Sequence, residues 1–480
     1  YDVLQNVQNP FDKNDTLGSV VSADPEKLNL VFGKAKAAQV DWNQSGGVWR
    51  AAILNKAADL IELRTARFIA ILMREAGKIH ADALAEVREA IDFLRYYSAQ
   101  AKSEFEEGVR LPGPTGEANT LHLCGRGVFV CISPWNFPLA IFIGQIAAAL
   151  AAGNSVVAKP AEQTPIVAVE ATRVLLEAGV PEGVFHTLLG GGEIGAAITK
   201  HSDVAGVAFT GSTKTAKLIN LTLAQKNGAI VPMIAETGGQ NVMFVDSTAL
   251  LEQVVDDVVT SAFISAGQRC SALRVLYLQE DIADAALTMI RGAMDMLTVG
   301  DPRHLSTDVG PIIDAPAASL LNAHVGQMKS KKFPFHQTNT DQALIEGHFV
   351  APHLFEIDSI QDLEKENFGP ILHVIRYDAS KLDETLKEAY STGFGLTLGV
   401  HTRMDQRWEK IFKRAPVGNT YVNRNMTGAV VGSQPFGGMG LSGTGFKAGG
   451  PRYIYRFASE KTLTINTMAS GGNTELLTLG

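Results

Sequence analysis

The sequence predicts an α/β protein with two lobes, each built around a parallel sheet. Short apolar runs alternate with helical stretches between residues 128 and 210, and the same alternation returns from residue 240. Repeated strand-helix-strand units form right-handed crossovers and give a parallel sheet that is covered on both faces. Residues 28–102 show apolar side chains at three- and four-residue spacing, which predicts a layer of helices packed over a sheet.

The first block contains four expected strands. They lie at residues 127–134, 155–160, 183–189 and 204–212, and helices expected at 137–152, 164–179 and 193–201 separate them. The most membrane-like window, Phe137–Ala158, is long enough to span a bilayer, but it contains Pro138, Gln145 and a Gly153-Asn154 pair. We therefore interpret this window as a buried helix, a turn and a strand.

The second block and the tail follow residue 240. Strands are expected at residues 241–246, 274–279, 371–378 and 396–402, with a helix over 254–267 and another after the second strand. Two successive α/β lobes make the cleft between them the expected place for a site. From Gly432 the chain is rich in glycine and then strand-like in EKTLTINT, which indicates a bridging or subunit-pairing segment.

Composition excludes several classes of protein. A chain of 480 residues, 46% of them apolar, buries too large a core for a disulfide scaffold or a disordered protein. Lys and Arg number 42 against 50 Asp and Glu, which leaves no basic surplus for nucleic acid. The three cysteines lack metal-ligand spacing and fit a reducing compartment, and we interpret Cys124 and Cys131 as small apolar residues. The opening YDVLQNVQNPFDKND shows no signal or transit pattern, so we expect a cytoplasmic protein without a metal site.

Two glycine loops, Gly190–Gly195 and Gly438–Gly443, match the pattern G-x-G-x-x-G. The first follows an expected strand and opens an expected helix, where backbone N–H groups can hold a pyrophosphate. The second precedes no helix and is expected to be a flexible loop. The acid that usually binds the ribose in a dinucleotide fold is missing, because Phe209–Lys214 occupies its place.

Lys159 and Glu162 offer another way to bind a ribose. An ammonium and a carboxylate three residues apart follow a strand of the expected parallel sheet, where they could grip both ribose hydroxyls. The carboxylate would repel a 2′-phosphate and so favour NAD over NADP. A solvated pair of loop charges explains the same spacing equally well.

Cys270 is the candidate nucleophile. It follows a segment of small residues, and the adjacent Arg269 favours a thiolate if it points towards the sulfur. A lone cysteine is more often a buried apolar residue, so the assignment depends on its companions. Glu236 can take a proton from a water or a thiol, and the Asn136 amide at a strand end can donate to an oxyanion. Each of these residues alone could be structural, whereas together they describe one chemistry.

Seven motifs, in order over nearly the whole chain, resemble the aldehyde dehydrogenase superfamily: SPWNFP, VVAKPAE, FTGS, ETGG, GQRC, ENFGP and PFGGMGLSG. Within it, ETGGQN, SAGQRCSALRVLYLQ, GLTLGVHTR, YVNRNMTGAVVG, FKAGGPRY and the closing INTMASGGNTELLTLG are similar to one family. That family is the L-glutamate γ-semialdehyde (Δ1-pyrroline-5-carboxylate) dehydrogenase part of bacterial bifunctional proline utilization A. The proline dehydrogenase barrel that would precede it, with its FAD, is absent, so we expect an excised domain.

The resemblance implies a catalytic role for three residues and a cofactor, NAD. Cys270 would attack the aldehyde, Asn136 and the Cys270 backbone N–H would hold the oxyanion, and Glu236 would activate the hydrolytic water. Lys159 and Glu162 would bind the adenosine ribose, Ser212 and the Gly190–Gly195 turn the pyrophosphate, and Glu366 and Phe368 the nicotinamide ribose. Ile132, Trp135, Phe209, Thr210 and Gly211 would line the rest of the cofactor site.

The same resemblance implies how the substrate is held. Ser271 and the backbone of Gly449 and Gly450 would anchor the α-carboxylate and amine, and Arg269 would lie beside them. Phe137 and Phe457 would flank the aliphatic part. The sequence departs from the family at Phe446, where relatives have proline, and this puts the closure of the anchor loop in doubt.

The resemblance also implies an aldehyde dehydrogenase fold with a β oligomerisation flap. Residues 1–236 would bind NAD, 237–428 would carry the nucleophile, and 429–480 would form the anchor loop and oligomerisation segment. A dimer or larger oligomer is expected, with no nucleic acid or membrane bound by this segment, although the full-length protein could associate peripherally with membrane. One alternative is another NAD(P)-dependent aldehyde dehydrogenase that acts on succinate semialdehyde or general aldehydes. A second is a coenzyme A-acylating enzyme, although such enzymes usually lack the glutamate found at Glu236. A third is a non-catalytic scaffold.

Overall fold

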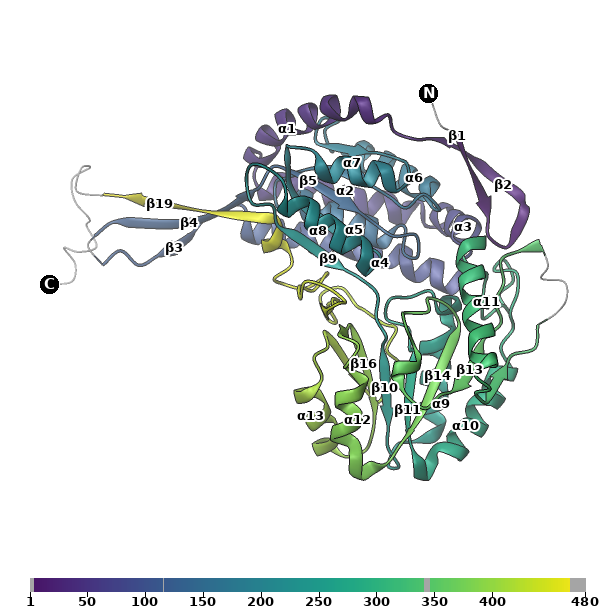
Figure 1. The fold of residues 1–480 in the computed structure, drawn as a ribbon. Coiled ribbons are helices and arrows are strands. Elements are labelled where there is room, and N and C mark those ends of the chain that lie inside the picture. Colours follow the sequence, from purple (N-terminus) through teal and green to yellow (C-terminus); the bar gives the residue numbers. More distant parts are fainter. Residues whose placement is uncertain (1–3, 115, 341–345, 467–480) are drawn as a thin grey trace.

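The protein, described by a computed structural model over residues 4–114, 116–340 and 346–466, has two α/β lobes and a projecting β-arm (Figure 1). The sheet of the first lobe has five parallel strands in the order β7-β6-β5-β8-β9. These strands are β5 (Val128–Ile132), β6 (Ser155–Lys159), β7 (Phe185–Thr187), β8 (Val204–Thr210) and β9 (Met233–Glu236). The parallel sheet expected for this block is confirmed, and β9 is a further strand that the sequence pattern did not reveal.

Helices cover both faces of this sheet. They are α1 (Leu28–Gln44), α2 (Gly47–Leu63), α3 (Thr65–Glu75), α4 (His80–Glu104), α5 (Ala140–Ala151), α6 (Pro165–Ala178), α7 (Gly192–Lys200) and α8 (Thr213–Ala224). Because strand side chains alternate between faces, Phe129 and Cys131 of β5 pack in the core beneath α2–α6, whereas Val128 and Val130 pack beneath α1, α7 and α8. All of β5 is therefore buried, as a doubly covered strand must be.

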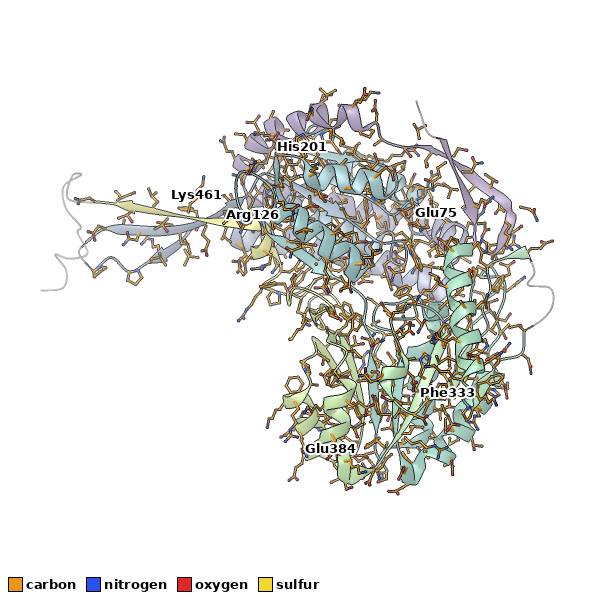
Figure 2. The ribbon with its side chains drawn as sticks, in the orientation of Figure 1. Glu75, Arg126, His201, Phe333, Glu384 and Lys461 are labelled. Carbon is orange, nitrogen blue, oxygen red and sulfur yellow. The ribbon has the colours of Figure 1, made fainter. Side chains whose placement is uncertain are left out.

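Two buried carboxylates hold the starts of α5 and α6. Glu86 on α4 accepts hydrogen bonds from the N–H groups of Leu139 (2.8 Å) and Ala140 (3.2 Å). Glu75, labelled in Figure 2, does the same for Ile166 (2.6 Å) and Val167 (2.9 Å) at the start of α6. A carboxylate at a helix N-terminus satisfies its free N–H groups and complements the helix dipole. The helical layer thus fixes the loop that joins β5 to α5.

The second lobe has a seven-stranded sheet in the order β12-β13-β14-β11-β10-β16-β17. The strands are β10 (Val242–Val245), β11 (Val275–Gln279), β12 (Phe335–Gln337), β13 (His353–Glu356), β14 (Ile371–Tyr377), β16 (Thr397–His401) and β17 (Asn419–Val422). Its helices are α9 (Leu251–Phe263), α10 (Glu280–Asp295), α11 (Ala315–Ser330), α12 (Leu382–Ala389) and α13 (Asp405–Arg414). All neighbouring strands run parallel except β12, which pairs with β13 in the antiparallel sense at one edge. The expected second α/β lobe is confirmed.

The arm is a three-stranded antiparallel sheet, β19-β4-β3, that extends away from the first lobe (Figure 1). It consists of β3 (Val109–Leu111), β4 (Ala118–Gly125) and β19 (Ala458–Ile465), so the strand expected in EKTLTINT begins two residues earlier, and it pairs with β4. The part of the predicted oligomerisation segment at residues 467–480 lies outside the described residues.

Two smaller features complete the fold. An N-terminal hairpin of β1 (Leu4–Asn9) and β2 (Asp12–Val21) precedes the helical layer and was not predicted from the sequence. A short pair, β15 (Phe394–Gly395) and β18 (Met439–Gly440), ties the glycine-rich tail to the second lobe. Within the described ranges, every helix is too short or too polar to cross a membrane.

Candidate active site

Cys270 follows a turn of unusual backbone conformation. The helix expected over 254–267 ends at Phe263, and the next residues Ser265 and Ala266 have φ angles of 56° and 53°. Such left-handed conformations are costly for residues with a Cβ and gather at functional sites. The prediction of a helix up to residue 267 is therefore wrong, because this turn replaces its last part.

Side chains of the second lobe hold the cysteine's backbone in place. Asn241, just before β10, donates from Nδ2 to the carbonyl oxygens of Cys270 (2.6 Å) and Ala272 (2.9 Å). Thr397 of β16 donates to the carbonyl oxygen of the buried Ser271 at 3.2 Å. The amino ends of β10 and β16 in the second-lobe sheet thus hold the turn through hydrogen bonds, so that a rigid part of the fold positions the thiol.

The Cys270 thiol is in its protonated form at neutral pH. Burial raises its pKa to about 12, with further increases from the charges of Glu366 and Glu236, while the backbone N–H of Ser271 favours the thiolate. Arg269 does not supply the activating charge expected of it, because its guanidinium pairs with Asp82 at 2.7 Å. A reaction here requires that a nearby base take the proton from the thiol.

We expect the E366Q variant to be alkylated by iodoacetamide faster than the wild type at pH 8. Removing the nearby negative charge lowers the pKa of the thiol, and a larger thiolate fraction reacts faster. Both rates should rise with pH up to pH 10. The measurement is the pseudo-first-order rate of label incorporation at Cys270 by mass spectrometry. An equal rate in both proteins would show that Glu366 does not act on the thiol.

Glu236 is the last residue of β9 and rests in a turn of the glycine-rich tail. Its Oε2 accepts a hydrogen bond from the Gly438 N–H at 2.8 Å, whereas Oε1 is buried with no hydrogen-bond partner in the described parts of the chain. Burial raises the pKa of this carboxyl well above its usual range, against the opposing effects of the Gly438 N–H and the Lys447 charge. A raised pKa suits a group that exchanges protons near neutral pH.

The second glycine loop is thus part of the site. It was expected to be a flexible loop, but Gly438 binds the carboxylate and Gly443 pairs with Glu236 in an isolated β-bridge. A Cβ at Gly443 would lie 2.9 Å from Glu236 Oε2, so the glycine permits this close approach.

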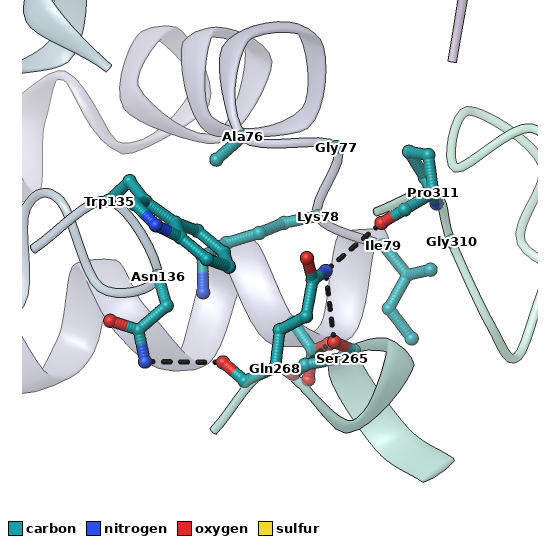
Figure 3. A pocket seen from close by; sticks show the side chains of 11 residues that line it. Ala76, Gly77, Lys78, Ile79, Trp135, Asn136, Ser265, Gln268, Gly310 and Pro311 are labelled. Carbon is teal, nitrogen blue, oxygen red and sulfur yellow. Dashed lines mark hydrogen bonds between the residues drawn. The ribbon is translucent and has the colours of Figure 1, made fainter. Parts of the chain in front are cut away.

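Asn136 lies in the loop after β5 and faces the Cys270 turn. Its Nδ2 donates to the carbonyl oxygen of Gln268 at 3.2 Å, two residues before the cysteine (Figure 3). The Gln268 side chain in turn donates to the Pro311 carbonyl oxygen at 3.0 Å and accepts from the Ile313 N–H at 3.0 Å. The amide proposed for an oxyanion is therefore adjacent to the nucleophile's backbone, although in this structure it is engaged with Gln268.

The residues expected to bind a dinucleotide gather at the carboxyl edge of the first sheet. Lys159 ends β6, and its buried ammonium donates to the Pro160 carbonyl oxygen (3.1 Å) and lies 3.4 Å from Glu162 Oε2. Burial lowers the pKa of Lys159, and Glu162 opposes this effect. Gly195 lies beside the lysine, because a Cβ added at this glycine would be 3.5 Å from Lys159 Cδ.

Two helix N-termini open at the same edge. Gly190 precedes α7 with a φ of 141°, a conformation that glycine adopts readily. Ser212 is the N-cap of α8 and accepts from the Thr215 N–H at 3.2 Å. Ile132 ends β5, Phe209 and Thr210 end β8, and the Gly211 N–H donates to the Glu236 carbonyl oxygen at 3.1 Å. N–H groups at helix starts are suited to bind a pyrophosphate.

Glu366 and Phe368 reach this edge from the second lobe. Glu366 Oε1 accepts from the Gly239 N–H at 3.1 Å and lies 3.8 Å from Arg274 Nη2. The ring of Phe368 meets Trp135 of the first lobe edge to face at 5.6 Å between centroids. Burial raises the pKa of Glu366, partly offset by Arg274 and the Gly239 N–H. The two lobes therefore face each other across the predicted nicotinamide ribose site.

Phe137 lies between two cations near the thiol. Its ring centroid is 4.2 Å from Lys78 Nζ and 5.4 Å from Arg269 Cζ. Arg269 also donates to Ser265 Oγ (2.8 Å) and to the Thr427 carbonyl oxygen (3.2 Å). These contacts place the Phe137 ring beside Arg269, the residue before the candidate nucleophile.

The structure does not support three of the predicted substrate residues. The N–H of Gly449 donates to Tyr97 Oη at 2.8 Å and that of Gly450 to the Lys447 carbonyl oxygen at 3.0 Å. Both glycines are buried, so neither has a donor left for a substrate carboxylate. Phe457 is fully buried and packs on Phe129 in the core of the first lobe, with 4.7 Å between ring centroids.

A different loop contacts Arg269, the residue before Cys270, and was missed. Arg269 binds the Thr427 carbonyl oxygen, and the next residues, Gly428 and Ala429, are half-buried with N–H groups that meet no acceptor among the described residues. Glu89 on α4 was also missed, although its charge acts on Cys270. Burial and the neighbouring Glu86 raise its pKa to about 7, against the charges of Arg269 and Lys78. Its sequence context is an ordinary helix and gives no signal of this role.

Comparisons with known proteins give a consistent picture. The model of the family described as "Aldehyde dehydrogenase family" matches residues 3–463. The bifunctional protein PutA of Klebsiella aerogenes is 51% identical over 95% of this chain, which covers 35% of that protein. A proline utilization A variant from Bradyrhizobium japonicum has a TM-score of 0.92 at 56% identity, covering 94% of this chain and 46% of its own. A 1-pyrroline-5-carboxylate dehydrogenase from Thermus with bound NAD has a TM-score of 0.92 at 32% identity, covering 97% and 90% of the two chains. The chain thus spans about a third of the length of its curated PutA relatives.

Proposed function

Because this chain belongs to the aldehyde dehydrogenase family, we propose that it oxidises L-glutamate γ-semialdehyde to L-glutamate with NAD, as a step of proline catabolism. The observation that carries the proposal is the meeting of Cys270, Glu236 and Asn136 at the junction of the two lobes. The relatives support the choice of aldehyde, since they are named proline utilization A and 1-pyrroline-5-carboxylate dehydrogenase. We further propose that the chain is the C-terminal part of a bifunctional enzyme whose other part holds FAD.

The residues present fit NAD. The Lys159 ammonium has three donors and meets only Pro160 and Glu162 among the described residues, so it retains capacity for a ribose hydroxyl. A Cβ at Gly192 would meet nothing within 4 Å, which leaves room at the start of α7 for a pyrophosphate. When bound, NAD accepts the hydride that leaves the substrate carbon.

Cys270 provides the covalent chemistry. After its proton passes to a base, the sulfur attacks the aldehyde carbon, and the new oxyanion accepts from the Asn136 amide and the Cys270 N–H. Loss of hydride from this thiohemiacetal leaves a thioester on the sulfur. Glu236 then takes a proton from water, which attacks the thioester and releases the carboxylate and the thiol. The sum is aldehyde, NAD and water converted to carboxylate, NADH and protons.

The substrate's amino acid end fits the charges near Phe137. We propose that the free N–H groups of Gly428 and Ala429, with Ser271, bind the α-carboxylate, and that Glu89 binds the α-ammonium. The aldehyde then points at Cys270, and the Phe137 ring covers the aliphatic part. The cations whose charges act on the Glu89 carboxylate are Arg269 and Lys78, and these are already paired with Asp82 and Glu86.

The proposal is tested by comparing three aldehydes with NAD: glutamate γ-semialdehyde, succinate semialdehyde and propanal. The wild type should show kcat/KM for the amino acid aldehyde at least about 100-fold above that for propanal, since two charged groups are recognised. E89Q should raise KM for glutamate γ-semialdehyde about tenfold and leave propanal unchanged. No preference among the aldehydes would overturn the substrate assignment, and turnover only with coenzyme A would favour an acylating enzyme.

Coenzyme choice provides a separate prediction. In E162A, the ratio of kcat/KM with NAD to that with NADP should fall about tenfold or more, because the carboxylate that repels a 2′-phosphate is gone. The measurement is initial NADH or NADPH formation at one aldehyde concentration. E193A is the matched control, since Glu193 lies nearby at the start of α7. An unchanged ratio in E162A would remove Glu162 from ribose binding.

The remaining parts of the chain have proposed roles as well. We propose that residues 1–236 form the NAD-binding part, 237–428 the part that carries the nucleophile, and 429–480 the bridging and oligomerisation part. The arm exposes Val109, Leu463 and Ile465, which are 64%, 50% and 49% accessible, and we propose that it pairs copies into a dimer or larger oligomer. A cytoplasmic location is part of the same proposal.

A further inference from the structure

Lys447 is a half-buried cation next to the general base, and the reaction described above does not use it. Its ammonium donates to the carbonyl oxygen of Gly437 and to Asn419 Oδ1, the latter at 2.9 Å. It lies in the tail segment that follows the second glycine loop, four residues after Gly443. A lysine held in this way loses side-chain entropy and part of its hydration, so its position calls for a compensating interaction.

Asn419, the first residue of β17, fixes the same turn from the other side. Its Oδ1 accepts from the Gly437 N–H at 3.2 Å as well as from the lysine, and its Nδ2 donates to the Pro435 carbonyl oxygen at 2.9 Å. Both polar groups of Gly437 are therefore bonded, its N–H to Asn419 and its carbonyl oxygen to Lys447. The asparagine and the lysine together determine where the following peptide points.

That following peptide holds Glu236. The Gly438 N–H donates to Glu236 Oε2 at 2.8 Å, and a Cβ on Gly437 would lie 2.8 Å from Oε1. The carboxylate thus lies directly against the turn that Lys447 and Asn419 hold. A shift of this turn moves the donor away from the carboxylate, and general base catalysis is sensitive to such distances.

The charges agree with this geometry. Lys447 is the cation whose charge lowers the pKa of Glu236, and burial lowers the pKa of Lys447 itself to about 8. The other ionisable groups that face Glu236 are Cys270 and the buried Tyr453 hydroxyl, on whose pKa the carboxylate acts. Burial opposes the negative form of Glu236, whereas the Lys447 charge and the Gly438 N–H favour it.

We propose that Lys447, held by Asn419, is a positioning residue for the general base: it fixes the turn in which Glu236 rests and stabilises the carboxylate form that hydrolyses the thioester. This inference rests on the role proposed for Glu236. It assigns Lys447 to the hydrolysis step and leaves the attack of Cys270 to the residues already described.

The test is the pre-steady-state time course of NADH formation and the pH profile of turnover in K447M, with propanal as well as glutamate γ-semialdehyde. The first turnover should keep its burst amplitude, whereas steady-state turnover at pH 7 should fall about tenfold. The acid limb of the pH profile should move up by about one unit, because without the cation the carboxyl ionises at higher pH. Part of the lost turnover should therefore return at pH 9.

Two further variants separate this role from a general loss of structure. K447R keeps the charge and should restore most of the steady-state rate and the original acid limb, and N419A should resemble K447M with a smaller effect. A purely structural role would reduce the burst and leave the acid limb in place, and that result in folded K447M overturns the proposal. Absence of NADH from both aldehydes in the wild type would instead contradict the proposed function itself.

Discussion

Replacing Cys270 with alanine is expected to abolish NADH formation from any aldehyde, lowering kcat/KM by at least about 10⁴-fold, while NAD still binds. The sulfur forms the only covalent bond between protein and substrate in the proposed reaction, so no other side chain substitutes for it. The strand ends that hold the turn, through Asn241 and Thr397, bond to backbone carbonyl oxygens and remain in C270A. The measurements are steady-state rates and NAD affinity by fluorescence titration.

C124A is the matched control for this variant. Cys124 lies in β4 of the arm, half-buried, with its thiol 3.5 Å from the Ser459 carbonyl oxygen and away from the cleft. It should retain activity within about twofold, because the change removes one weak contact at a distance from the site. Activity in C270A equal to that in C124A would remove the proposed nucleophile.

The second large effect is expected for E236Q. Glutamine has nearly the same shape and can accept from the Gly438 N–H, but it cannot take a proton from water. Hydrolysis of the thioester should slow about 10²- to 10⁴-fold, whereas hydride transfer should still occur once per site. The expected time course is a burst of NADH equal to the enzyme concentration, followed by very slow turnover.

This outcome depends on which base takes the proton from the thiol. If Glu236 also activates Cys270, the burst in E236Q will be slower but will reach the same amplitude, and it will accelerate with pH as the thiol ionises. The raised pKa of Cys270 makes this acceleration measurable between pH 7 and pH 10. A full steady-state rate without a burst would assign hydrolysis to another residue.

The residues of the proposed catalytic constellation could be picked out from the sequence because they lie in short, recognisable motifs. Glu236 ends β9 and Asn136 follows β5, so the parallel topology places both at the carboxyl edge of the first sheet, whereas Cys270 lies in the turn before β11 of the second sheet. The two parallel sheets followed from the alternation of apolar runs and helices for the same reason. Elements with weaker periodicity, such as β9 and the N-terminal hairpin, gave no comparable signal.

The substrate anchor could not be predicted because it depends on which backbone groups remain unbonded. Gly449 and Gly450 have the expected composition for an anion-binding loop, yet Tyr97 Oη and the Lys447 carbonyl oxygen already accept hydrogen bonds from their N–H groups. Whether an N–H is free is decided by residues more than 300 positions away in the chain, as with Tyr97 and Gly449. The left-handed turn at Ser265 and Ala266 is likewise invisible in a sequence that reads as helical.

The most direct test of the account is the mass of the intermediate trapped on the E236Q variant. The protein is mixed with NAD and glutamate γ-semialdehyde, quenched in acid after one turnover, digested and analysed by mass spectrometry. We predict a glutamyl group attached as a thioester to the peptide that contains Cys270, in an amount equal to the NADH burst, and none in C270A. An unmodified Cys270 peptide despite a full NADH burst, or an adduct on another residue, would contradict covalent catalysis by Cys270.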